Sequence, residues 1–303
     1  MHISDANLSE IDLSPLNQVN QLKSITFSKC KLDSVIRRDF AKLKSIEGIG
    51  FDELTVTAPT LTNLIKMPNL KGFSAIKSNL ERDDLRMLLA NKNLEGLSFQ
   101  NVDIYRQGKT IDTWPSTLKH LMIYGGNFTR EDLLGIASLR HLEHLEIGHP
   151  SFDEDLLLTF GSMENLQSLV LSGNLLSEQS IQVVSAKMRP KRLTLSGGVL
   201  QGSTIKVLAE MPKLQFLFLQ QIRLTDQDLH TLSSSKNLQE LKFTSSNISD
   251  DSIFELAKIP TLVSLVYPFR SNVKSDLDFR EKFLAERHRL GFAAPRLTPC
   301  AAL

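Results

Sequence analysis

The sequence predicts an α/β solenoid, in which repeated strand–helix units stack their strands into one parallel sheet. The first observation is an apolar triplet, Leu-x-x-Leu-x-Leu, that recurs every 24 residues. The second is that this interval continues through eleven copies without an insertion or deletion. The third is a polar capping residue and a second apolar run after many of the triplets. Self-similarity at a period of roughly 20–50 residues is the mark of a repeat architecture.

Each 24-residue unit begins with a predicted strand. Apolar residues at positions 4 and 6 run from Ile25 and Phe27 in the first complete copy to Leu265 and Tyr267 in the last. Because successive side chains of a strand point to opposite faces, positions 4 and 6 point into the core and positions 3, 5, 7 and 8 point outward. Position 1 of the eleven copies is Leu22, Ile46, Leu70, Leu94, Leu118, Leu142, Leu166, Pro190, Leu214, Leu238 and Leu262.

The second half of the unit predicts a short helix. Thr129, Thr225 and Ser249 each offer an N-cap oxygen, and acidic residues follow in the first turn. Apolar residues then recur at helical spacing, as at Leu133, Ile136 and Ala137. Strand-then-helix copies imply a parallel sheet on one side and helices on the other. About twelve units, over residues 1–272, are expected to form one solenoid.

These units resemble the leucine-rich repeat family, whose pattern is L-x-x-L-x-L-x-x-N/C-x-L. The resemblance implies a horseshoe with the sheet on its concave face and short helices on its convex face. The helix-bearing units look most like the ribonuclease-inhibitor-like, F-box-associated and bacterial branches. Position 9, where the family often has Asn or Cys, holds Cys30 and Asn174 but otherwise mixed residues, so no continuous side-chain ladder is expected at this position.

The unit that begins at Leu94 departs from the pattern. Lys109 and Asp112 stand where the helix should place apolar residues, so residues 101–110 are predicted to be a loop. Trp114, the only tryptophan, is expected to fill the space left by the missing helix. A contact of Trp114 with a partner on the convex side is the alternative.

The C-terminal part is predicted to leave the repeat. Residues 273–290 read as a longer helix that caps the array, and charged residues including Arg287 are expected to form its outer, solvated face. Residues 291–303 contain two prolines and are predicted to be a flexible tail. The tail ends in Cys-Ala-Ala-Leu, which resembles a C-a-a-X prenylation box with Cys300 as the lipidated residue. The alternative is a cysteine that stands there by chance.

Composition gives no sign of nucleic-acid binding, because the net charge is only +1. The two cysteines, Cys30 and Cys300, lie far apart in the chain, which fits a reducing compartment. The N-terminal residues do not resemble a signal peptide, and no apolar run approaches transmembrane length. We therefore expect a cytoplasmic monomer that can associate with membranes through Cys300.

The sequence shows no nucleophile–base constellation and no phosphate-binding loop, so we predict neither catalytic residues nor a cofactor. His120 and His144 share position 3 of neighbouring units, and Glu146 stands at position 5. Strands about 4.8 Å apart would bring these side chains close. Exposed, solvated groups are the more common arrangement, and no metal ligands are assigned.

The predicted function is non-enzymatic recognition of a protein partner on the concave face. That face is small and polar in the first five units and then acquires larger side chains, with Phe216 and Phe218 at its centre. Apolar residues exposed together often mark a binding site. The alternative is a translocated bacterial effector or a ubiquitin-ligase substrate adaptor. The predicted partner-binding residues are Phe216, Phe218, Lys242, Arg192, His120, Met122, Tyr124, His144, Glu146 and Phe269.

Overall fold

The structure is a computed structural model. It divides into two compact units, unit 1 (Met1–Phe152 and Thr159–Gly161) and unit 2 (Asp153–Leu158 and Ser162–Leu303). The described residues are 1–8, 13–19, 21–30, 42–55, 64–105, 109–161, 163–172, 177–200, 202–244, 248–268 and 273–300, without the side chains of 273 and 274.

Unit 1 is built on a parallel sheet in which each strand lies beside the next copy of itself along the chain. Its pairs are offset by 24 residues, so that Ile49 lies beside Ile25 and Phe73 beside Ile49. A second, two-stranded sheet pairs β5 with β7. The main sheet consists of β1 (His2–Ser4), β2 (Ser24–Ser28), β3 (Gly48–Asp52), β4 (Gly72–Ile76), β6 (Gly96–Gln100), β8 (His120–Tyr124) and β9 (His144–Gly148), and the second of β5 (Asn79–Glu81) and β7 (Asp103–Tyr105).

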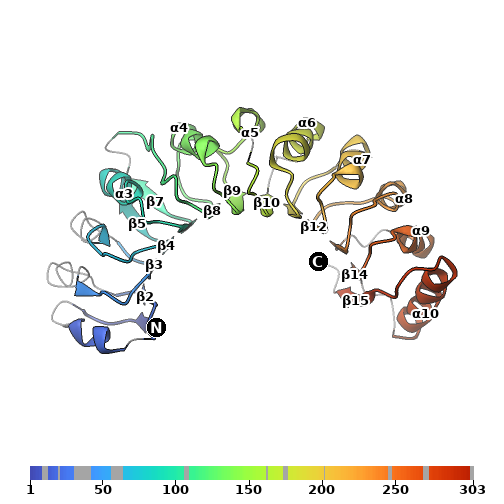
Figure 1. The fold of residues 1–303 in the computed structure, drawn as a ribbon, viewed down its shortest axis with the longest axis horizontal. Helices are drawn as coiled ribbons and strands as arrows, with labels where there is room; N and C mark the ends of the chain where they lie inside the picture. The colour runs from blue at the N-terminus through green and yellow to red at the C-terminus, as the bar shows by residue number, and fades with distance from the viewer. Residues whose placement is uncertain are drawn as a thin grey trace. The chain divides into compact units, whose positions relative to one another are not determined.

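Unit 2 contains a parallel sheet of the same kind, and its helices lie along one side of it (Figure 1). Its strands are β10 (Ser168–Ser172), β11 (Arg192–Ser196), β12 (Phe216–Gln220), β13 (Glu240–Phe243), β14 (Ser264–Pro268) and β15 (Arg296–Cys300). Within the described residues of both units, the α-helices are α3 (Arg82–Leu89), α4 (Arg130–Leu134), α5 (Glu154–Thr159), α6 (Glu178–Val183), α7 (Gly202–Glu210), α8 (Asp226–Leu232), α9 (Asp250–Glu255) and α10 (Val273–Arg289), with shorter turns η1 (Ser14–Gln18), η3 (Gly135–Ser138), η4 (Val184–Met188) and η5 (Leu256–Lys258).

The strands bury alternate side chains, as the sequence pattern predicts. In β12, Leu217 and Leu219 are buried while the residues on either side of them are half-buried. The core therefore lies between the sheet and the helices within each unit. Burying one leucine or phenylalanine side chain contributes about 1.5–3 kcal/mol, and the repeat supplies two such residues from nearly every strand.

The residue after each strand adopts a left-handed backbone conformation in many copies. Lys29, Glu53 and Lys77 have φ of 52°, 52° and 45°. Each of these residues donates its backbone N–H to the last carbonyl of the next strand, as Lys29 does to Asp52 at 3.0 Å. Positive φ is uncommon for residues other than glycine, so the repeated hydrogen bond fixes a conformation that the side chains at these positions do not favour.

The predicted N-caps are confirmed at three helices. The hydroxyls of Thr129 and Thr225 accept from the backbone N–H three residues later, and Asp132 and Asp228 complete capping boxes by accepting from the cap residue. The Ser249 hydroxyl accepts from the N–H of residue 252 in the same way. Each cap contributes roughly 0.5–2 kcal/mol to helix stability.

Trp114 fills the core beside residues 109–119, which the structure describes without a helix, and this confirms the first of the two interpretations. Its indole is buried, and Nε1 donates to the backbone oxygen of Asp132 at 2.8 Å. Its ring packs near those of Phe99 and Phe128. The predicted loop over residues 101–110 needs one correction, because Asp103–Tyr105 form strand β7 against β5.

The predicted flexible tail requires a larger correction. Arg296–Cys300 form β15, which lies parallel to β14 with Leu297 beside Leu265. The offset here is 32 residues (297 minus 265) instead of 24, because α10 is longer than the other helices. Because the interval is not 24 residues, the sequence pattern did not show that Leu297 continues the row of position-4 residues. Residues 301–303 lie outside the described residues.

Arg287, predicted to lie on the outer face of α10, is instead 1% exposed. Its guanidinium donates to the backbone oxygens of Ala257, Ile259, Leu262 and Ala293. Burial lowers the pKa of this side chain, and the five N–H donors of arginine suit a cluster of carbonyls. The side chain therefore satisfies carbonyls at the end of η5, before β14 and after α10.

Candidate functional site

The face of each sheet opposite the helices carries the side chains of positions 3, 5 and 7, and we call it the open face. In unit 1 it includes five predicted binding residues. His120, Met122 and Tyr124 come from β8, and His144 and Glu146 come from β9. His120 is exposed and the other four are half-buried. The alternation of the strand therefore places these side chains where the sequence predicted them.

A groove of about 620 Å³ crosses the open face of unit 1. It reaches from Ser24 and Thr26 on β2 to His144 and Glu146 on β9. Six strands of the main sheet contribute to it, and five intervals of about 4.8 Å give a length of about 24 Å. An extended chain of about seven residues covers this length at roughly 3.4 Å per residue.

The floor of the groove has few side chains. Gly48, Gly72 and Gly96 lie side by side on β3, β4 and β6, and Gly50 and Ser74 form a second row of small residues. An added Cβ at Gly72 or Gly96 would meet its nearest heavy atoms only at 3.9 Å. Packing therefore does not require glycine at Gly72 and Gly96. The small residues are visible in the sequence, but their pattern alone does not mark a site.

Larger side chains stand at the β8–β9 end of the groove. The sulfur of Met122 accepts from the Ser98 hydroxyl at 3.4 Å and from the Gln100 amide at 3.1 Å. Burial raises the pKa of Tyr124 to about 12, and the charge of Glu146 and a hydrogen bond to it act in the same direction. Tyr124 is therefore a neutral phenol at physiological pH. Met122, the rings of His120 and His144, and Glu146 line this end of the groove, so it offers a thioether sulfur, two imidazoles and a carboxylate.

A row of alternating charges runs along the groove, just before the strands. Glu47 accepts from Lys23 and Lys71, both at 2.9 Å, and these hydrogen bonds lower the pKa of Glu47 to about 2. Lys119 pairs with Glu95 at 2.8 Å. Neighbouring 24-residue repeats thus carry opposite charges at position 2 of the repeat. The row consists of Lys23, Glu47, Lys71, Glu95, Lys119 and Glu143.

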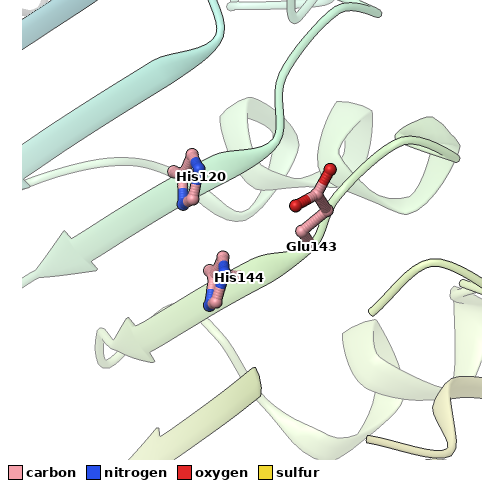
Figure 2. A group of neighbouring side chains, drawn as sticks. All are labelled: His120, Glu143 and His144. Atoms are coloured by element: carbon pink, nitrogen blue, oxygen red, sulfur yellow. The ribbon is translucent and has the colours of Figure 1, made fainter. Parts of the chain in front are cut away.

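His120 and His144 form a stacked pair where this row meets the end of the groove. They are register partners on β8 and β9, with ring centroids 4.6 Å apart and an angle of 8° between the planes. Figure 2 shows Glu143 beside them at the start of β9. One ligand atom from each of the three residues lies within 4.8 Å of the other two. Burial lowers the pKa of His120, and His144 lowers it further.

The carboxylate next to the histidines is thus Glu143 and not Glu146, which the position in the repeat had suggested. The difference has a simple cause. Glu143 precedes the strand and lies near the ring of His144, while Glu146 comes three residues later, within β9, and interacts with Tyr124. The signal that was missed is an acidic residue directly before a histidine that begins a strand.

The two predicted rings of unit 2 lie on the open face of β12 but are only partly accessible. The guanidinium carbon of Arg192 lies 3.6 Å from the centroid of the Phe216 ring, and Nζ of Lys242 lies 4.3 Å from that of Phe218. Both distances are within the range of cation–π attraction. Each cation comes from a neighbouring strand, β11 or β13. Phe216 and Phe218 are therefore half-buried, because Arg192 and Lys242 partly cover their rings.

Two predicted site residues remain. Phe269 lies outside the described residues. Cys300 is part of β15, where its thiol is half-buried and lies 3.7 Å from the backbone oxygen of Phe243. Burial raises the pKa of the Cys300 thiol. Among the described residues, no helix has both the length and the apolar character needed to cross a bilayer.

The sequence matches no protein-family model and no curated protein. The structure is similar to that of an internalin (inlF) from Listeria monocytogenes, with a TM-score of 0.52 and 18% identity over 86% of this chain and 71% of the internalin. It also matches a plant peptide hormone receptor, RGFR1 in complex with RGF2, with a TM-score of 0.41 and 15% identity over 84% of this chain and 42% of the receptor. The likeness to the internalin, a leucine-rich repeat protein, shows that this chain has the leucine-rich repeat fold.

Proposed function

We propose that this chain is a non-enzymatic protein-recognition scaffold that binds an extended segment of a partner protein in the groove of unit 1. The observation that carries the proposal is the glycine floor. Glycine weakens a strand by roughly 0.5–1 kcal/mol relative to alanine, and Gly72 and Gly96 have space for a Cβ. Glycine inside a strand often marks a place where a ligand or another backbone approaches closely.

The shape and charge of the groove favour this kind of ligand. Its length of about 24 Å fits an extended chain better than a compact small molecule. The charges along its edge alternate and pair with one another, so they provide no net attraction for an acidic or basic ligand. We therefore expect the binding energy to come from apolar contact and hydrogen bonds, and we expect affinity to change little with ionic strength.

The partner can be captured by photo-crosslinking. A photoreactive amino acid at Ser74, which lines the groove, should crosslink to the partner. The same amino acid at Met87, on the exposed side of α3 in the same unit, should not. The captured protein is then identified by mass spectrometry, and its binding to the purified chain is titrated. Equal capture from both positions would contradict the groove assignment.

Filling the groove provides the decisive measurement. The double substitution Gly72→Val and Gly96→Val places branched side chains on the floor, and valine suits a strand. We expect binding of the captured partner to weaken by more than about 2 kcal/mol, as for a hot spot, without a lower melting temperature. Met87→Ala is the matched control and should bind normally. Wild-type affinity in the double variant would refute the proposal.

Phe216 and Phe218 remain a second proposed contact surface, now with Arg192 and Lys242 as its outer layer. Changing both rings to alanine should weaken binding by more than about 2 kcal/mol if they are a hot spot, with little change in melting temperature. An early loss of structure in this variant would instead assign the rings to the core. The effector and adaptor alternatives use the same surfaces, and the identity of the captured partner distinguishes them.

A further inference from the structure

We propose that His120, His144 and Glu143 form a binding site for a divalent transition-metal ion such as Zn²⁺, Co²⁺, Ni²⁺ or Cu²⁺. This inference does not depend on the proposed protein ligand. It starts from the register of β8 and β9, which places two histidines directly beside each other. Stacking of the rings at 4.6 Å brings one nitrogen of each imidazole close to the other.

The third ligand comes from the residue before β9. One carboxylate oxygen of Glu143 and one nitrogen from each histidine lie within 4.8 Å of one another. Two ligands bound to one ion at about 2.1 Å lie at most about 4.2 Å apart. Rotations of exposed and half-buried side chains can close this small difference. The nearly parallel ring planes must tilt toward each other, because the nitrogen lone pairs lie in those planes.

The neighbouring charges are compatible with a cation. Lys119 acts on Glu143 electrostatically, but its ammonium donates to Glu95 at 2.8 Å. Glu95 therefore offsets the positive charge beside the site. Two imidazoles and one carboxylate suit zinc and the later first-row metals. Three protein ligands leave at least one coordination position for water or another group.

Cobalt provides a direct test, because its visible absorption reports both binding and ligand type. Purified full-length protein is titrated with Co²⁺, and the affinity for Zn²⁺ is measured by competition. We expect one equivalent of Co²⁺ to bind with nitrogen and oxygen ligands and without a thiolate charge-transfer band. This spectrum separates the proposed site from binding at Cys30 or Cys300.

Three substitutions assign the ligands. His120→Ala, His144→Ala and Glu143→Gln should each weaken metal binding by at least about tenfold. His141→Ala, which removes an exposed histidine from the same part of the chain, should leave it unchanged. Circular dichroism confirms that each variant is folded. Unchanged affinity in the His120 and His144 variants, or no Co²⁺ binding by the wild-type chain, would overturn the proposal.

Discussion

At Gly135 an added Cβ would come within 2.6 Å of Cδ1 of Trp114, whereas at Gly72 the nearest heavy atoms lie 3.9 Å away. The two residues are equally small in the sequence, but only one is required by packing. At Gly135 the indole occupies the space that a side chain would need, and that indole replaces a missing helix. At Gly72 the space is open toward the groove.

We therefore predict opposite effects on stability. Gly135→Ala should lower the free energy of unfolding by about 1–3 kcal/mol, because it overpacks the buried indole. Gly72→Ala should raise it by about 0.5–1 kcal/mol, because alanine restricts the unfolded chain more than glycine does. Urea denaturation of both variants measures the difference. A destabilised Gly72→Ala variant would show that the groove floor is constrained by the fold itself.

Asp84 shows a different effect of burial at the level of one residue. It is 3% exposed, and its Oδ2 has no hydrogen-bond partner. Burial raises its pKa from 3.8 to about 6, and the charges of Glu81 and Asp83 add to the shift. Between these two pH values the folded chain holds a proton that the unfolded chain has released, so this residue's contribution to stability falls as pH rises.

Asp84→Asn should therefore stabilise the protein more at pH 7 than at pH 4, because only the charged carboxylate is penalised by burial. Asp155→Asn is the matched control, since Asp155 is an exposed carboxylate in the first turn of α5 and does not act on Asp84. Thermal unfolding of both variants at the two pH values provides the comparison. A gain from Asp84→Asn that is the same at both pH values would contradict this explanation.

Among the elements, β15 changes what is expected of Cys300. The sequence predicted prenylation from a flexible tail, but the structure pairs Cys300 with Pro268 in a parallel strand. Attachment of an isoprenoid to the thiol would require β15 to leave β14. The modification therefore stays a prediction from sequence, and the structure adds a competing interaction to it.

We expect that a Leu297→Asp substitution, which disfavours the packing of β15, increases any isoprenoid attachment at Cys300 in a eukaryotic cytosol. Leu297 lies beside the buried Leu265, and a charge there is costly. Intact-mass analysis of both chains measures the modified fraction, with Cys300→Ser as the control. The absence of added mass in both chains would end the lipidation hypothesis.

At the scale of the whole molecule, one spacing determines which side chains are buried. Leu217 lies between Leu193 and Leu241 on neighbouring strands, while Lys242 is exposed on the open face. In repeat proteins each unit contacts mainly its neighbours, so stability is spread along the chain rather than held in one central core. Truncating one buried leucine nevertheless lowers the free energy of unfolding, because it leaves a cavity in the packing of its own repeat.

Leu217→Ala should lower the free energy of unfolding by about 2–5 kcal/mol, because it leaves a cavity at a position that is 2% exposed. Lys242→Ala should change it by no more than about 0.5 kcal/mol. Denaturant titration of the two variants tests the assigned frame. Equal midpoints would mean that the frame is wrong.

The fold class, the buried strand positions and three helix caps could all be predicted from the amino-acid sequence. These features follow from the 24-residue period, from the alternation of side chains along a strand and from local capping. Each of these patterns can be read along the linear sequence. Trp114 could also be placed, because one unit lacks the apolar residues of a helix and a single large ring is available nearby.

Features that depend on residues close in space but distant in the chain could not be predicted and became visible in the folded structure. The left-handed conformation of Lys29, Glu53 and Lys77 comes from hydrogen bonds to the next strand and not from their side chains. The burial of Arg287 depends on carbonyls 25 to 30 residues away. The positions of the cations over Phe216 and Phe218, and the approach of Glu143 to the histidine pair, depend on the directions of the side chains. The pairing of β15 depends on an interval that differs from the 24-residue period. A one-dimensional pattern does not contain these quantities.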